Sequence, residues 1–152
     1  MFDKIKTRLA SEQGFTLIEL LVVMIILGIL VAIAVPAYLS FTTKAKQAAG
    51  QANVRSAIPA AESYYQDTAG GNSSYTGITG DALRTEAPGV SQNVLAVDLN
   101  GGAGYCVEDT EPGSTTTYSY IGGDPGAGVA STLIGSIQAA TCSANDGGHA
   151  AG

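Results

Sequence analysis

The sequence is short of basic residues, and beyond residue 60 it has a single one, Arg84. Seven lysines and arginines stand against 13 aspartates and glutamates, so the formal net charge is −6. Binding to nucleic-acid phosphates requires clustered lysine and arginine side chains. The composition therefore argues against nucleic-acid binding by the isolated C-terminal part of the chain.

Histidine and cysteine are also scarce. His149 is the one histidine, Cys106 and Cys142 are the two cysteines, and no C-x-x-C pattern occurs. Catalytic and metal sites are usually built from clusters of such residues, and the aspartates do not have EF-hand spacing. We predict no catalytic site, no cofactor and no metal site, with a Ca²⁺ ion in a Gly/Asp loop as the alternative. An extracellular location would oxidise the two cysteines.

Charge is also missing from a long run near the N-terminus. Leu20 to Val35 carries no charged residue, and the apolar character continues to Leu39. Twenty residues of helix span about 30 Å, which is the thickness of a bilayer core. Residues 1–14 have a net charge of +1, so the rest of the chain carries −7. This distribution predicts a membrane helix with a cytoplasmic leader and an outward-facing C-terminal part.

The order of these segments is unusual for a secretory signal, which places its apolar region before the cleavage site. Here the small residues Ala10, Ser11 and Gly14 precede the apolar run. The alternatives are an uncleaved membrane anchor or a leader cut after Gly14. The anchor does not explain Glu19, because a carboxylate at the head of a membrane-length helix is costly.

The string Gly14-Phe15-Thr16-Leu17-Ile18-Glu19 resembles the class III signal of type IV prepilins. The resemblance implies that a prepilin peptidase cuts between Gly14 and Phe15 and methylates the Phe15 amine. It implies a subunit held in the cytoplasmic membrane and then polymerised into an extracellular filament of identical subunits. An assembly ATPase and a membrane platform are the further partners implied. We expect Glu19 to pair with the Phe15 amine of a neighbouring subunit.

Two residues weaken the apolar helix. Pro36 lacks an amide hydrogen and crowds the carbonyl of Ala32, so we expect a kink, and Gly28 lowers helix propensity. The resemblance implies that the stretch between Gly28 and Pro36 can lose helicity in a filament. The alternative is a packing glycine and a simple kink.

The remaining sequence predicts an α+β fold like that of type IV pilins, in which a long kinked helix packs on a small antiparallel sheet. Residues 40–67 continue the helix, with Val54, Ile58, Ala61 and Tyr65 on one face and a kink at Pro59. The head is expected over 68–142 and a flexible tail over 143–152. Strands are predicted at 94–99, 104–108, 116–121 and 137–142.

The loop between Cys106 and Cys142 corresponds, by the same resemblance, to the disulfide-bounded region of those pilins. The function expected is a structural pilin subunit and not an enzyme. The alternatives are a pseudopilin of a type II secretion or competence system, a minor pilin at the filament tip, and a monomeric membrane-anchored binding module. Adhesion, motility, DNA uptake, conduction and glycosylation are not predicted by the sequence.

Overall fold

The computed structural model describes residues 15–69, 71–127 and 129–142. Their elements are α2 (Leu17–Gln66), α3 (Gly80–Glu86), β1 (Val94–Leu99), η1 (Asn100–Gly102), β2 (Gly104–Asp109), β3 (Tyr118–Gly123) and β4 (Ile137–Gln138). The predicted α+β class, with a long helix and a small antiparallel sheet, is confirmed. The predicted leader, 1–14, and tail, 143–152, lie outside the described residues. The chain divides into two compact units, Met1–Phe41 and Thr42–Gly152, and α2 contributes residues to both.

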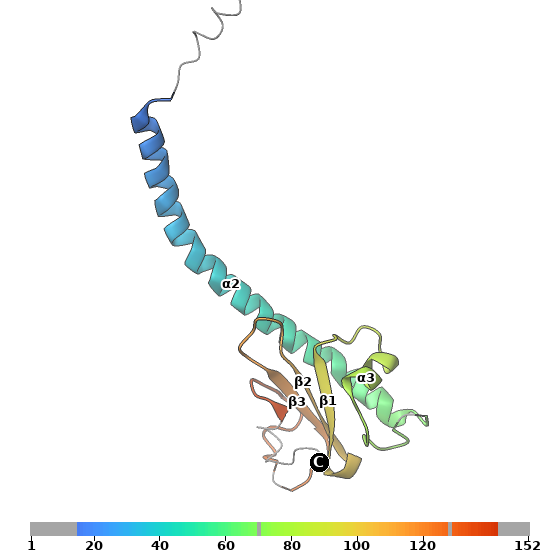
Figure 1. Ribbon diagram of the computed structural model, residues 1–152. Helices are drawn as coiled ribbons and strands as arrows, with labels where there is room; N and C mark the ends of the chain where they lie inside the picture. The colour runs from blue at the N-terminus through green and yellow to red at the C-terminus, as the bar shows by residue number, and fades with distance from the viewer. Residues whose placement is uncertain (1–14, 70, 128, 143–152) are drawn as a thin grey trace, which may run out of the picture. The chain divides into compact units, whose positions relative to one another are not determined.

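The four strands form an antiparallel meander in the order β1-β2-β3-β4 (Figure 1). The first two lie where the alternating sequence pattern predicts them. The third begins at Tyr118 rather than at residue 116, and the fourth is only Ile137–Gln138. One position beyond the end of the β2–β3 ladder, the hydroxyls of Thr110 and Thr117 are hydrogen-bonded to each other at 2.6 Å.

The helix α3 is not predicted from the sequence. Thr79 caps it, since its Oγ1 accepts a hydrogen bond from the Ala82 amide at 3.2 Å. Asp81 lies in the first turn and pairs with Arg84 at 2.6 Å. A threonine cap, an acid in the first turn and a following proline, Pro88, are recognised start and stop signals. Seven residues are too few to show the apolar periodicity on which the sequence analysis relied.

The second half of α2 packs on one face of the sheet, but the buried helix face is rotated from the predicted one. Its buried residues are Gly50, Val54, Ala57, Ala60, Ala61 and Tyr64. Ile58 and Tyr65 are only partly buried. Small residues prevail on this face because the helix and the sheet approach closely. The helix continues past Pro59, as predicted, and ends at Gln66.

Glu62 connects this helix to the sheet. Its two carboxylate oxygens accept hydrogen bonds from the hydroxyls of Tyr75 and Tyr105, each at 3.0 Å. Both tyrosines are buried, and buried hydroxyls need partners. Burial, together with the Glu62 carboxylate, raises the pKa of both phenols. Glu62 is itself exposed, so an exposed helix residue serves as the acceptor for two core residues.

Asp109 is a second acid that contacts the core. It is buried at the C-terminal end of β2, the strand that also carries Tyr105. Its Oδ2 accepts a bond of 3.5 Å from Asn53, whose amide also bonds Glu111 at 2.5 Å. Within the described part of the chain, its Oδ1 is buried without a hydrogen-bond partner. Gly50 permits this approach, because a Cβ there would lie 3.2 Å from the Tyr118 ring. Burial raises the pKa of the Asp109 carboxyl, the Asn53 bond lowers it, and the Glu111 charge raises it.

These contacts predict that Asp109→Asn stabilises the head at neutral pH. A carboxyl whose pKa is raised by folding destabilises the native state above its unfolded pKa of about 4. Below that pH the carboxyl is protonated in both states and does not affect the free energy of unfolding. Above it the destabilisation grows with pH until the pH passes the folded pKa. Unfolding of the full-length variant should therefore cost roughly 1 kcal/mol more than that of the wild type at pH 7, and the difference should vanish near pH 3. Denaturation at both pH values measures this.

Asp98→Asn is the matched control, because Asp98 is a partly exposed carboxylate on β1. It should leave stability unchanged at both pH values. An Asp109→Asn protein that is less stable than the wild type at pH 7 would contradict the prediction.

Candidate functional site

The first half of α2 is apolar on every side, and no other described residue of its own unit covers it. Of the 21 exposed large hydrophobic side chains in the described residues, 19 lie between Phe15 and Phe41. The most apolar 18-residue window of α2 has a mean hydropathy of 3.1, and none of it is buried. It is the one helix, among the described residues, that is long and apolar enough to cross a membrane. Water is a poor solvent for such a surface, so this segment requires lipid or other protein around it.

A hydrogen-bonded cap begins this helix. The Thr16 Oγ1 accepts a bond from the Glu19 amide at 3.2 Å. In return, the Glu19 Oε2 accepts bonds from the Thr16 amide at 2.9 Å and from the Thr16 hydroxyl at 2.7 Å. This reciprocal arrangement is a capping box, in which side chains bond the amides that a helix start leaves without partners. Glu19 is thus positioned by its own helix before any second subunit arrives.

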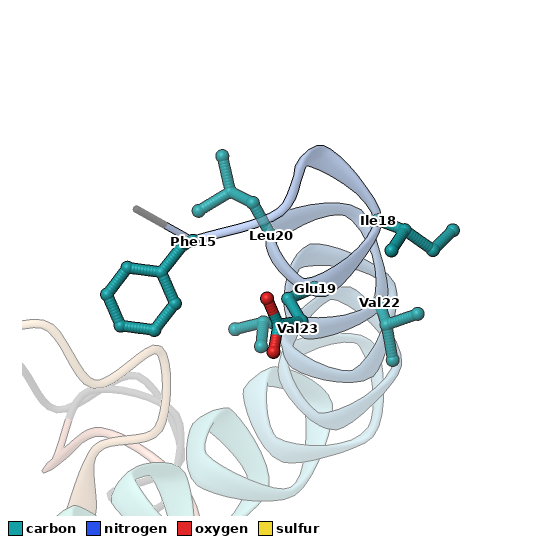
Figure 2. A pocket seen from close by; sticks show the side chains of 6 residues that line it. All are labelled: Phe15, Ile18, Glu19, Leu20, Val22 and Val23. Atoms are coloured by element: carbon teal, nitrogen blue, oxygen red, sulfur yellow. The ribbon is translucent and has the colours of Figure 1, made fainter. Parts of the chain in front are cut away.

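Phe15 lies on the same side of the helix as the Glu19 carboxylate, whereas Ile18 and Val22 project from the opposite side (Figure 2). Phe15, Ile18, Glu19, Leu20, Val22 and Val23 form an open surface at this helix start, which is apolar except for the Glu19 carboxylate.

Thr16 is the residue of this site that the sequence analysis missed. It was quoted as part of a motif without a role of its own. The signal was available, because a threonine followed three residues later by a glutamate, just before an apolar run, is the sequence pattern of a capping box.

Gly28 and Pro36 both lie inside continuous α-helix. A Cβ placed on Gly28 would meet no atom within 4 Å. Any packing role for Gly28 therefore needs a second molecule, and the loss of helicity between these residues stays a prediction.

Cys106 and Cys142 form the predicted disulfide, with their Cα atoms 5.8 Å apart. Cys106 lies on the face of β2 that points away from α2. It packs there with Leu99, Ile121 and Cys142 in a second, smaller core. The Cys142 amide also donates to Glu108 at 2.6 Å. The bond thus holds the C-terminal loop over the outer face of the sheet.

The family described as "Prokaryotic N-terminal methylation motif" matches residues 9–35. A relative from Thermus thermophilus, named "Type IV narrow pilus major component PilA5", is 37% identical over 103 residues. That match covers 59% of this chain and 89% of the relative. The chain belongs to the type IV pilin family. It is accordingly a structural pilin subunit and not an enzyme.

Two further relatives differ in how much of the pilin chain they match. "Type IV wide pilus major component PilA4" of Thermus thermophilus is 26% identical over 132 residues, covering 87% of this chain and 98% of that protein. "Type IV major pilin protein PilA" of Myxococcus xanthus is 40% identical over 56 residues, covering 37% of this chain. This chain spans only 26% of that longer protein. No solved structure matches the chain.

Removal of the disulfide by Cys106→Ser with Cys142→Ser should destabilise the head. In the chain-entropy account, closing a loop with a sequence separation of 36 stabilises the folded state by about 3 to 4 kcal/mol. Denaturation of the full-length double variant should show a loss of this size, and reduction of the wild-type protein should reproduce it. Two titratable thiols in native wild-type protein collected outside the cell would contradict the prediction.

Proposed function

We propose that this pilin is cut between Gly14 and Phe15 by a prepilin peptidase and methylated at the new amine. It then waits in the cytoplasmic membrane with the apolar half of α2 in lipid. An assembly ATPase and a membrane platform extract it into a filament outside the cell. The observation that carries this proposal is the exposure of nearly every large apolar side chain from Phe15 to Phe41. Lipid covers that surface before assembly, and the same surface of other subunits covers it afterwards.

Assembly has an electrostatic requirement as well as an apolar one. Helices gathered in a filament centre exclude water, and an unpaired carboxylate there is expensive. No lysine or arginine occurs between Phe15 and Lys44. The α-amine of Phe15 on a neighbouring subunit is then the cation available to Glu19, and it exists only after the leader is removed. Cleavage therefore acts as the switch that permits polymerisation.

The capping box supports this pairing, because Thr16, the residue that directly follows the new N-terminal Phe15, already holds the Glu19 carboxylate. A carboxylate held in one rotamer loses less side-chain entropy on pairing than a free one. The subunit interface is heterologous and does not close, so repetition yields an open helical fibre. A pilus is preferred over a pseudopilus because the relatives reported above are named as pilus components.

Processing is tested by sequencing the N-terminus of filament or membrane material. It should begin at Phe15, with an N-methylated residue. Gly14 replaced by a bulky residue should block the cut, because the peptidase must approach the backbone closely there. A mature chain that begins at Met1, or beyond the apolar segment, would sink the proposal.

Glu19→Ala should leave insertion and cleavage intact but reduce filament yield at least about tenfold, since the buried amine loses its partner. Glu19→Asp should be intermediate, because it is one methylene short. The measurement is the amount of subunit in sheared filaments relative to the amount in membranes.

Glu19→Gln separates the two roles of the side chain, because a glutamine oxygen still accepts the Thr16 bonds but carries no charge. It should assemble as poorly as Glu19→Ala. Wild-type yield from Glu19→Gln would assign the residue to helix capping alone and would remove the ion pair from the mechanism.

A further inference from the structure

A groove of about 370 Å³ lies on the head between the exposed side of α2 and the short edge strand β4. It is lined by Gln51, Arg55, Ile58, Tyr120, Gly135 and Ile137. All of these residues belong to the second compact unit. The groove is separate from the Phe15 and Glu19 site, and nothing derived above gives it a role.

Three side chains of this groove have hydrogen-bonding groups without a partner among the described residues, although the Tyr120 ring packs on Tyr105. Within the described residues, Gln51, Arg55 and Tyr120 make no side-chain hydrogen bond or ion pair. Two other cations of the head have partners, since Arg84 pairs with Asp81 at 2.6 Å and Lys46 donates to the Gly113 carbonyl at 3.2 Å. The guanidinium of Arg55, the amide of Gln51 and the phenol of Tyr120 can therefore all donate hydrogen bonds to a ligand in this groove.

The chemistry of the lining selects the ligand. The groove contains no acid, and its remaining walls are the side chains of Ile58 and Ile137 and the backbone of Gly135. Arg55 is exposed and presents a planar fork of N–H groups that matches a carboxylate. A carboxylate on a short aliphatic stem fits this combination of donors and apolar surface.

We propose that the groove beside Arg55 receives an exposed aspartate or glutamate of a second copy of this chain in the filament. This inference rests on the proposed function, because only polymerisation brings copies together. Charge supports the choice of partner: residues 42–142 carry nine acids and four bases. Asp98 is one carboxylate that lacks a side-chain partner within the described residues. Arg55 also belongs to α2, the helix whose first half makes the proposed assembly contact.

Lys44 provides the matched control, because it is an exposed cation on the same helix and does not line the groove. Filaments carrying Arg55→Gln or Lys44→Gln are isolated from cells that assemble them, and the free subunit is measured as salt is raised. Arg55→Gln should release about fivefold more subunit than the wild type, as expected for the loss of one partly screened ion pair per contact. Lys44→Gln should match the wild type.

A crosslink identifies the occupant. The photoreactive residue benzoylphenylalanine replaces Gln51 in full-length chains, and filaments are built from mixed ¹⁴N and ¹⁵N subunits. Crosslinked peptides of mixed isotope, with an aspartate or glutamate on the second peptide, support the proposal. Crosslinks confined to one chain, to lipid or to another protein overturn it.

The two proposals fail differently. If wild-type cells make filaments and Arg55→Gln filaments resist salt as well as Lys44→Gln filaments, the groove contact is wrong and the pilin function stands. If wild-type chains form no filament at all, the proposed function itself is wrong.

Discussion

The constraint on which the rest of this molecule depends is an apolar helix surface that the chain cannot cover by itself. Among the described residues of the first unit, 15–41, the structure contains no element besides this part of α2. The free energy of exposing such a surface to water is large, at about 25 cal/mol per Å². Lipid and the helices of neighbouring copies can each cover this surface and so remove the cost. Transfer of the helix from lipid to a bundle of helices therefore changes the apolar free energy little. We therefore look to polar groups at the helix start for the interactions that set the timing and the axial register of assembly.

Glu19 and Thr16 are suited to that decision because their bonds are local. The capping box lies within one turn of a single chain, so it forms in the membrane without help from a neighbour. A helix N-terminus also stabilises a nearby negative charge through its dipole. Inside a bundle of helices water is excluded, and the helix dipole alone does not stabilise the charge enough. Burial of the same carboxylate then costs free energy. In the assembly proposed above, one side chain therefore tolerates the first environment and needs a partner in the second.

The apolar helix through Leu39 could be predicted from the sequence, because the length and composition of such a run are local properties. The same holds for strands β1 and β2, whose alternation survives in the fold. The sequence could not reveal which face of α2 is buried, since Val54, Ala57 and Ala61 are too small to dominate an apolar pattern. Nor could it pair Glu62 with Tyr75 and Tyr105, which lie 13 and 43 residues away. Contacts of that separation depend on the register of the sheet, which a single sequence does not specify.

The head shows how a small domain with few large apolar residues is held together. Its helix offers mainly alanine and glycine to the core, which allows close approach but buries little area for each residue. Hydrogen bonds from buried tyrosines to Glu62 fix the helix on one face of the sheet, and the disulfide closes the other face. Because the hydrogen bonds to Glu62 and the disulfide act on opposite faces of the sheet, loss of either one should lower the stability of the head independently of the other. Several polar side chains on the outer side of α2 also bond within the head, as Lys46 does to the Gly113 carbonyl. Arg55 makes no side-chain hydrogen bond or ion pair within the described residues, and the proposed contact between subunits is therefore placed at this residue.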